Sequence, residues 1–517
     1  MKDEYKPSRG TFIVLHPSSL ILALLSGALT VLGFAPFHFT ALPLITLALL
    51  FWQWSKAGTP RQAFRIGWAF GLGFFLAGVS WIYVSLHTFG AMPMPLAALA
   101  TLLFCAFLAL FPATAGYVVT YSRRSADIKL MLIAPACWVL IEWVRSWIFT
   151  GFPWNTIGYT QIPGSPFAGF APALGIYGVS LAATVIAGCI TVLAMRWREN
   201  KTLSRPAAVI VISLTVCGFA LKQIEWTAPA GAPTTVSLIQ GNIAQDMKWR
   251  DDQMRATLDI YARLIATSNA QLIVLPETAL PLFLNQVPRD YLDALAAHAA
   301  KNKGDVLFGV PEREPDGAYY NTTVSVGSSP AQAYRKSHLV PFGEFIPLRP
   351  ALAWIVNILA IPLQDFSRGA VDQQPLNVAG QRVAVNICYE DVFGEEIIRQ
   401  LPQATLLVNM SNVAWFGRSI APAQHLQISQ ARALETGRYM LRATNTGMTA
   451  VIDPHGKVER VAPQFETMVL THTVRGYEGV TPYVRWGNYA VLILLVIFLG
   501  LAWRLPAQTG DPPPNST

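Results

Sequence analysis

The chain has 517 residues, of which 53% are hydrophobic and 13% are charged, and its formal net charge is +8. The charged share is half of the usual ~25%, which argues against a soluble globular protein and indicates a polytopic membrane protein. The excess Lys and Arg residues lie mostly in short loops between apolar runs, and no basic stripe with interleaved aromatic residues occurs, so the charge does not indicate nucleic-acid binding. The length predicts roughly two to four domains.

Eight apolar segments follow one another, seven of them in the first half of the chain. They cover residues 18–34, 41–54, 66–86, 93–121, 130–149, 173–195, 207–223 and 487–503. Most approach the length of about 20 residues that a membrane-spanning helix needs, whereas 41–54 is short enough to be tilted or partly interfacial. Lys2, Lys6 and Arg9 precede the first segment as in a signal peptide, but the further segments favour an uncleaved anchor.

The loops between these segments alternate in charge. Lys and Arg gather after the second, fourth and sixth segments, whereas loops 35–40, 87–92 and 150–172 contain neither residue. By the positive-inside rule, the basic loops and both termini are cytoplasmic. We therefore expect four parts: seven transmembrane helices in 1–223, a periplasmic domain in 224–486, an eighth transmembrane helix in 487–504 and a cytoplasmic tail in 505–517.

Glu142 and Arg145 stand out as charged residues inside the fifth apolar segment. They are three positions apart, so on a helix they share a face and are able to pair. Charged residues inside a membrane are usually either functional or mutually neutralised, and both interpretations stay open for this pair.

The domain after residue 224 has a different pattern. Short apolar runs at 234–243, 271–276, 305–310, 382–387 and 404–410 predict strands, and helical patterns lie near 252–268, 288–302 and 422–437. Strands that alternate with helices indicate a layered α/β domain around a mixed or parallel sheet.

Three places in this domain have the form of a strand that ends in a reactive residue: Glu277, Lys336 after Ala-Tyr-Arg, and Cys388. Taken singly, each has an ordinary explanation, because strand-end Glu and Lys are usually solvated and a lone buried Cys is usually inert. At the ends of strands in one sheet they would converge on one rim, where Glu277 supplies a general base and Lys336 a positive charge for a developing oxyanion.

The five cysteines support this interpretation of Cys388. The other four lie in apolar runs where no disulfide framework is readable: Cys105, Cys137, Cys189 and Cys217. Cys388 lies in the polar half without an evident partner, which favours a free thiol.

In these residues the sequence resembles the nitrilase superfamily, and together with eight spans it resembles the apolipoprotein N-acyltransferase family of bacterial lipoprotein maturation. The motifs are Leu-Pro-Glu-Thr at 275–278, Tyr-Arg-Lys-Ser-His-Leu-Val-Pro-Phe-Gly-Glu at 334–344, Cys-Tyr-Glu at 388–390 and Ser-Asn-Val-Ala-Trp-Phe-Gly at 411–417. One position departs from the family pattern, because Val413 stands where the family usually has Asp.

The resemblance implies a fold and a set of site residues. The fold is an eight-helix bundle in the bacterial inner membrane that carries a nitrilase-like αββα sandwich on its periplasmic side. The catalytic triad is Glu277, Lys336 and Cys388, and the supporting residues are Trp249, Glu344, Tyr389 and Glu390.

The implied activity is a ping-pong acyl transfer without cofactor or metal. A phospholipid, in the family phosphatidylethanolamine, donates its sn-1 acyl chain to Cys388 as a thioester, and the α-amine of S-diacylglyceryl-cysteine on an apolipoprotein then takes the chain. Glu277 moves the protons, while Lys336 and a backbone N–H at the Cys388–Tyr389 turn hold the oxyanion. Glu344 orients Lys336 or the base.

Lipid substrates require access from the bilayer. The apolar segment 346–364 suits a lipid-facing lid, although a buried helix is the alternative, and Trp415 and Phe416 either line the acyl pocket or belong to the core. Two rival functions remain. One is a membrane-anchored amidase or nitrilase-type hydrolase, in which water replaces the amine, and the other is a transporter or receptor whose outer domain only binds.

Overall fold

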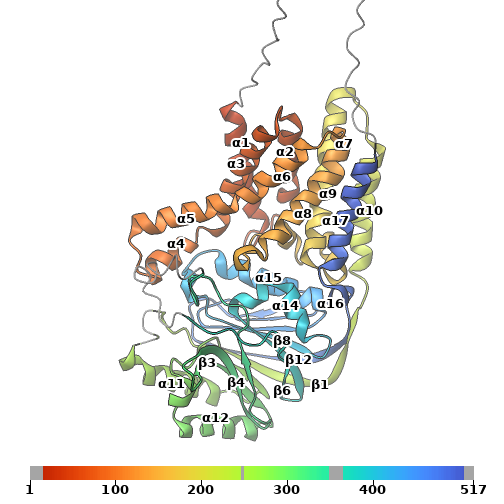
Figure 1. Cartoon of the computed structure of the whole chain (residues 1–517). Helices are drawn as coiled ribbons and strands as arrows, with labels where there is room; N and C mark the ends of the chain where they lie inside the picture. The colour runs from red at the N-terminus through yellow and green to blue at the C-terminus, as the bar shows by residue number, and fades with distance from the viewer. Residues whose placement is uncertain (1–15, 246–247, 249, 348–364, 506–517) are drawn as a thin grey trace, which may run out of the picture.

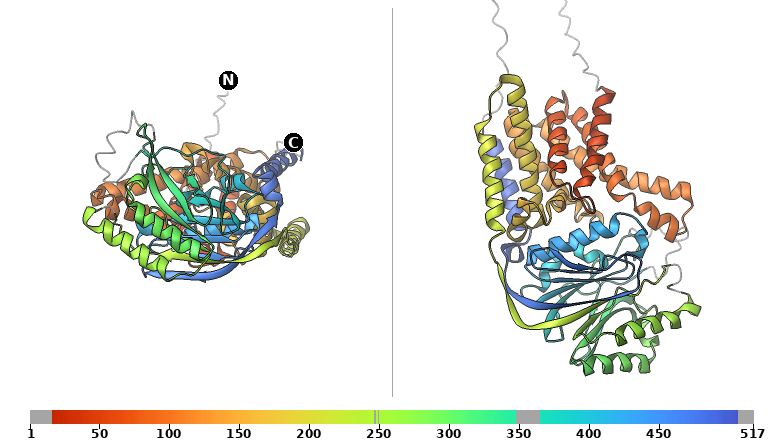
Figure 2. Two further views of the ribbon diagram at one scale, coloured as in Figure 1. Left: turned by 90° about the horizontal axis from the view of Figure 1, so that it is seen from below. Right: turned by 180° about the vertical axis from the view of Figure 1, so that it is seen from behind.

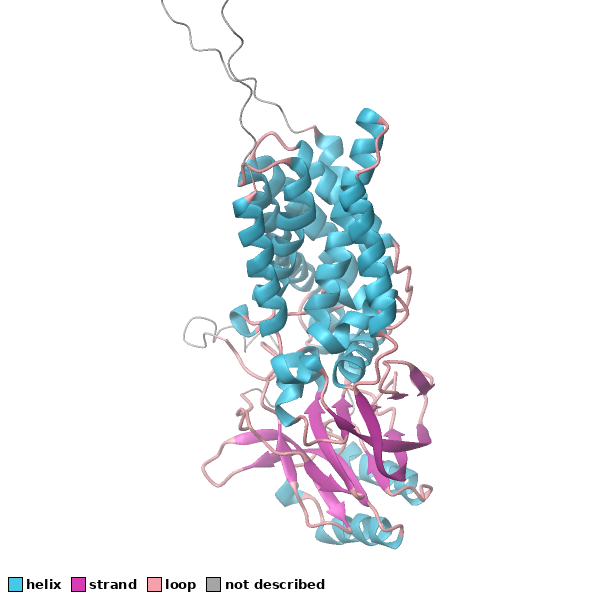
Figure 3. Cartoon of the chain, turned by 90° about the vertical axis from the view of Figure 1, so that its right-hand side faces the viewer, coloured by secondary structure: helices cyan, strands magenta, loops and turns pink. Residues whose placement is uncertain are grey.

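The computed structural model describes residues 16–245, 248, 250–347 and 365–505. Its helices and strands separate into two regions, a bundle of helices at one end and a layered α/β domain at the other (Figures 1 and 3). The view from behind shows the same division, with both ends of the described chain at the far end of the bundle (Figure 2). The change in sequence character near residue 224 therefore marks a real structural boundary.

Each of the eight apolar segments forms helix. The helices are α1 (Pro17–Thr30), α2 (Leu42–Lys56), α3 (Pro60–Val79), α5 (Met94–Leu108), α6 (Leu110–Tyr121), α8 (Ala134–Arg145), α9 (Ala171–Asn200), α10 (Arg205–Leu221) and α17 (Tyr489–Arg504). Segment 93–121 is divided between α5 and α6, which meet at Ala109.

Three helical stretches among the described residues are long and apolar enough to cross a membrane: Pro60–Val79, Met94–Tyr121 and Pro166–Asn200. Pro17–Gly33, Arg205–Leu221 and Tyr489–Arg504 are shorter apolar helices. These lengths fit a membrane-inserted region, and the count of eight spans stays a prediction.

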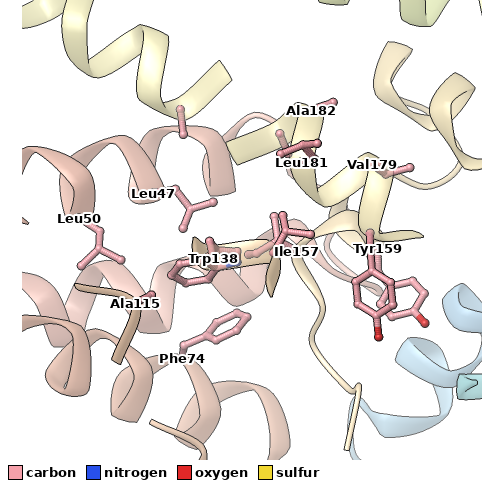
Figure 4. Packing of buried hydrophobic residues seen from close by; sticks show 14 of the residues in the cluster. Leu47, Leu50, Phe74, Ala115, Trp138, Ile157, Tyr159, Val179, Leu181 and Ala182 are labelled. Carbon is pink, nitrogen blue, oxygen red and sulfur yellow. The ribbon is translucent and has the colours of Figure 1, made fainter. Parts of the chain in front are cut away.

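The bundle is held together by interlocking aromatic and small residues. Phe74 and Trp138 lie in its core with Leu47 and Leu50 (Figure 4). Close approach of α1 to α3 depends on glycine, because a Cβ atom added at Gly73 would lie 2.0 Å from the carbonyl oxygen of Leu24. Small residues commonly allow such contacts between membrane helices.

The uncharged stretch after α8 is mostly buried. It folds into the short helices η4 (Ile148–Thr150), η5 (Ile157–Gln161) and η6 (Pro166–Phe170), and Trp154 within it is buried. The indole N–H of Trp154 donates to Gln424 of the α/β domain at 2.8 Å. This stretch therefore fills the junction between the two regions.

The α/β domain contains two six-stranded mixed sheets. The first has the order β12 (Met468–Gly479), β1 (Thr227–Gln240), β2 (Leu272–Val274), β3 (Asp305–Arg313), β4 (Tyr319–Gly327), β5 (Ala333–Arg335). The second has the order β11 (Val458–Val461), β10 (Ala450–Ile452), β9 (Met440–Thr444), β8 (Leu406–Ser411), β7 (Gln381–Ile387), β6 (Leu376–Val378). Strands β1–β3 and β7–β9 are parallel, and β2, β8 and β9 are buried along their whole length, as is typical of strands covered on both faces.

Three apolar layers join these sheets to each other and to helices. Val236 and Val385 belong to the core between the sheets. The outer face of the first sheet packs on α11 (Asp251–Ala266) and α12 (Arg289–Lys301), and the outer face of the second packs on α15 (Ala421–Thr436). The predicted αββα sandwich is thus confirmed, with α15 on the side of the bundle (Figure 1).

We predict that Gly73→Leu destabilises the bundle by about 1–3 kcal/mol, because the new side chain would collide with the backbone of α1. Thermal unfolding of the purified protein in detergent measures the change. Gly500→Leu on α17 is the matched control, since a Cβ atom there meets nothing within 4 Å. Equal melting temperatures for the two variants would contradict this account of the α1–α3 contact.

Candidate active site

Cys388 lies at the end of β7, where the chain turns abruptly. It opens the short helix η9 (Cys388–Val392), and its φ of +54° is in the left-handed region that non-glycine residues rarely adopt. The side-chain amide of Asn409 donates to the Cys388 carbonyl oxygen at 3.1 Å and so supports the turn. The turn holds the thiol at a fixed place. Strained backbone of this kind is common at functional sites.

Glu277 follows β2 and is buried, with each carboxylate oxygen engaged. One oxygen accepts from the side-chain amide of Asn321 at 2.8 Å and lies 3.4 Å from Lys336 Nζ. The other accepts from the backbone N–H of Asn412 at 2.9 Å. Burial by itself would raise the pKa of Glu277, but Lys336, Asn321 and Lys248 hold it below its usual value, so the carboxylate stays ionised.

Lys336 follows β5, and only 1% of its side chain is exposed. Its Nζ lies 2.9 Å from the Glu344 carboxylate, and Asn321 also donates to Glu344 at 3.0 Å. Burial opposes the charge on Lys336, but the carboxylates of Glu344 and Glu277 raise its pKa above the usual value. The residue is therefore a permanent ammonium ion between two carboxylates.

The thiol of Cys388 lies within the field of these charges. Burial raises its pKa, the Glu277 carboxylate raises it further, and Lys336 lowers it. The resting group is therefore a protonated thiol beside an ionised carboxylate. This arrangement needs proton transfer to the carboxylate before the sulfur can act as a nucleophile.

One expectation about these residues was wrong. Glu277 and Lys336 follow strands of the first sheet, whereas Cys388 follows β7 of the second, so the three do not belong to one sheet. They meet because the two sheets stack face to face and these strands end at the same side of the sandwich.

Glu390 ties the Lys336 segment to the Cys388 turn. One carboxylate oxygen accepts from the backbone N–H groups of Ser337 and His338, at 2.7 and 3.1 Å, and from the hydroxyl of Tyr334 at 3.0 Å. The other oxygen accepts from the backbone N–H of Ile387 at 2.7 Å. Glu390 thereby joins the segment after Lys336 to the strand before Cys388.

Tyr389 faces the helix bundle. Its hydroxyl donates to the Gly151 carbonyl oxygen at 3.1 Å, and its ring lies 5.2 Å from that of Phe393. Tyr389, Val392 and Phe393 belong to the same apolar cluster as the bundle helices. The turn at Cys388 therefore packs directly against the helix bundle and the loop at Gly151.

Trp415 and Phe416 also lie where the two regions meet. The Phe416 ring is 4.6 Å from Trp81, and the Trp415 ring is 6.1 Å from Phe89. Both side chains are half-buried, and their place in an acyl pocket stays a prediction. Two other sequence-based predictions, Trp249 and most of the lid at 346–364, fall outside the described residues.

Several residues that contact the site were not identified from the sequence. Asn321 in β4 bridges Glu277 and Glu344, and Lys248 donates to the Glu277 carbonyl oxygen at 3.2 Å. Asp391, next to Glu390, accepts from His425 at 2.7 Å and lies 3.3 Å from Arg442. Glu390 and Asp391, shortly after Cys388, were a sequence signal for Asp391, and Lys248 directly precedes the predicted supporting residue Trp249. Asn321 lies in no motif that points to the site.

A layered α/β domain with Glu, Lys and Cys at its strand ends, joined to apolar helices, defines a carbon–nitrogen hydrolase-type domain attached to a membrane region. Family models agree: the apolipoprotein N-acyltransferase N-terminal domain matches residues 26–189, and the carbon-nitrogen hydrolase domain matches residues 235–483. Among solved structures, the C. elegans NitFhit protein is similar at 17% identity and a TM-score of 0.37, covering 51% of this chain and 65% of that one.

Full-length relatives are more similar. The apolipoprotein N-acyltransferase of Nitrosomonas europaea is 54% identical over 492 residues, which cover 95% of this chain and 98% of that protein. The apolipoprotein N-acyltransferase of Chromobacterium violaceum is 44% identical over 95% of both chains. The chain belongs to the apolipoprotein N-acyltransferase family.

We predict that Glu390→Gln weakens the catalytic turn by about 1–3 kcal/mol, because the new amide group would meet N–H groups that need an acceptor. Thermal unfolding reports the stability, and the rate of Cys388 alkylation reports the geometry of the turn. Glu466→Gln at an exposed position is the control and should change neither measurement. Wild-type stability and alkylation in the Glu390 variant would show that the carboxylate is dispensable.

Proposed function

We propose that the protein transfers an acyl chain from the sn-1 position of a phospholipid, through a thioester on Cys388, to the N-terminal amine of S-diacylglyceryl-cysteine on apolipoproteins. The observation that carries this proposal is the cluster of Glu277, Lys336 and Cys388, in which the turn at Cys388 packs against membrane-type helices. Phosphatidylethanolamine is the proposed donor.

In the first half-reaction, Glu277 accepts the proton of the Cys388 thiol and the sulfur attacks the ester carbonyl carbon. The Lys336 ammonium and a backbone N–H at the Cys388–Tyr389 turn stabilise the tetrahedral oxyanion, and one such donor is worth about 3–4 kcal/mol of the barrier. Glu277 then returns the proton to the departing alcohol, so a lysophospholipid leaves and a thioester remains.

In the second half-reaction, the free amine of the acceptor attacks the thioester carbonyl. Glu277 takes a proton from the amine and gives it to the departing Cys388 sulfur. The products are an N-acyl amide and the original thiol, so the enzyme returns to its starting state. Glu344 keeps Lys336 charged and in place throughout, since it lies 2.9 Å from the ammonium.

The contact between the catalytic turn and the bundle favours transfer between lipids over hydrolysis of a soluble amide. Tyr389 bonds to Gly151, and Phe416 packs against Trp81 on the helical side. A hydrolase with a soluble substrate needs only one anchoring helix and no such contact. Trp415 and Phe416 are accordingly proposed to contact the acyl chain.

We further propose eight transmembrane helices in a bacterial inner membrane, with both termini cytoplasmic. Residues 1–223 would carry helices 1–7, 224–486 the periplasmic catalytic domain, 487–504 helix 8, and 505–517 the cytoplasmic tail. The uneven distribution of Lys and Arg between the loops supports this orientation.

The orientation is testable by cysteine labelling in a background that carries Cys217→Ser and Cys388→Ser. We expect a membrane-impermeant maleimide to label Lys301→Cys, which is exposed on α12, in intact spheroplasts. Thr202→Cys, exposed between α9 and α10, should react only after permeabilisation. The opposite labelling pattern would invert the proposed topology.

For the reaction itself, we expect Cys388→Ala and Cys388→Ser to lose acyl transfer by about 10³-fold or more while the protein stays folded. Purified wild-type protein incubated with phospholipid should gain the mass of one acyl chain on the peptide that contains Cys388. A diacylated lipopeptide should then discharge that adduct as N-acyl peptide.

The same experiment separates the rival functions. Release of the adduct only as free fatty acid would favour the hydrolase. If no adduct forms on the folded wild-type protein, acyl transfer through Cys388 is excluded.

A further inference from the structure

A second buried lysine lies beside the triad and has no role in the reaction described above. Lys248 is 3% exposed, and its Nζ donates to the Thr278 hydroxyl at 2.7 Å and to the Glu277 carbonyl oxygen at 3.2 Å. Its charge acts on the Glu277 carboxylate and on the Cys388 thiol. A buried ammonium costs several kcal/mol unless it is compensated, so its presence at this place needs a reason.

Among the described residues around the thiol, the carboxylates of Glu277 and Glu344 share the single ammonium of Lys336. Lys336 lies closest to Glu344, and Asp391 is paired with Arg442 and hydrogen-bonded to His425. Glu390 accepts only from backbone N–H and hydroxyl groups. Glu277 shares the Lys336 ammonium, which lies 3.4 Å away, with Glu344, and the charge of Lys248 also stabilises the Glu277 carboxylate.

Proton transfer within the site makes this balance important. When the thiol proton moves to Glu277, the negative charge moves from the carboxylate to the sulfur, and the number of charges does not change. With Lys248 charged, the charges of Lys248, Lys336, Glu344 and the Glu277–Cys388 pair sum to zero both before and after the transfer. Without that charge, an uncompensated negative charge is buried in both states, and a thiolate is disfavoured in such a site.

We propose that Lys248 is a positioning residue whose ammonium charge balances the Glu277–Cys388 pair, so that this pair, Glu344, Lys336 and Lys248 together carry no net charge when the thiolate forms. This inference rests on the proposed reaction through Cys388.

The protonation of Lys248 agrees with this role. Burial lowers its pKa to about 8, against the opposing effect of Glu277 and Cys388. Because the charged form is the protonated one, the balancing charge is present at neutral pH and is lost as the pH rises through this value. Arginine at this position would keep the charge at every accessible pH.

A purely structural role is the alternative. Lys248 also bonds to the turn that follows Glu277, where Thr278 has a φ of +44°. Glutamine keeps N–H donors for these two acceptors but carries no charge, whereas methionine removes both. Comparison of Lys248→Gln, Lys248→Met and Lys248→Arg therefore separates charge from hydrogen bonding.

The test measures alkylation of Cys388 by iodoacetamide against pH, read on the Cys388 peptide by mass spectrometry. We expect Lys248→Gln and Lys248→Met to shift the profile to higher pH by about one unit, which is about tenfold slower alkylation at pH 7. Lys248→Arg should match the wild type near pH 7 and react faster than it at pH 9. Lys457→Met, an exposed lysine in the same domain, is the control and should not shift the profile.

The outcomes are distinct. If the alkylation profile shifts in Lys248→Met but not in Lys248→Gln, Lys248 acts only by its hydrogen bonds to the turn after Glu277. That result would overturn the inference. If thermal unfolding shows that Lys248→Met does not fold, Lys248→Arg is compared with the wild type at pH 9. Equal alkylation rates of these two proteins at pH 9 would overturn the inference. A wild type that forms no acyl adduct with phospholipid refutes the proposed function, whereas the alkylation profiles judge the role of Lys248 independently.

Discussion

The site depends on mutual compensation of charges that are removed from water. Glu277, Glu344 and Lys336 are all largely buried, and Lys336 lies between the two carboxylates at 3.4 and 2.9 Å. An isolated buried charge would be lost by a change of protonation, because desolvation costs more than the fold is able to supply. The carboxylates of Glu277 and Glu344 and the ammonium of Lys336 are therefore stable only as a group. Asn321 completes the group by donating to both carboxylates.

The stacking of the two sheets brings Glu277, Glu344 and Lys336 close to Cys388, and the helix bundle contacts the turn at Cys388. Lys336 and Glu277 come from the first sheet and Cys388 from the second, so the core between the sheets sets their separation. Glu390 joins the segment after Lys336 to the strand before Cys388. On the other side, Gln424 of α15 accepts from the indole N–H groups of Trp81 and Trp154. A displacement of the helices would therefore reach the catalytic turn, which is consistent with lipid substrates arriving from the bilayer.

Sequence patterns predicted the elements well where the signal was local. Each apolar segment became helix, including the short 41–54, which forms α2 (Leu42–Lys56). The strand before Cys388 was predicted as 382–387 and is Gln381–Ile387. The division of 93–121 between α5 and α6 was not predicted, because both halves are equally apolar. The single-sheet expectation failed because periodicity shows that a strand is buried but does not show which sheet it joins.

Local sequence patterns were enough to identify the kinds of chemistry available: a thiol, a carboxylate and an ammonium, each shortly after a short strand, in a chain with many apolar helices. These signals are carried by neighbouring residues, so they are readable without the fold. Only the tertiary structure decided which charges meet. Lys248 reaches the backbone of Glu277 from 29 positions away, and Asn412 donates to its carboxylate from 135 positions away. Such pairings depend on how strands from two sheets stack, and no local pattern encodes that distance. The physical reason is that a buried charge is stabilised by whatever the fold places beside it, not by its neighbours in sequence.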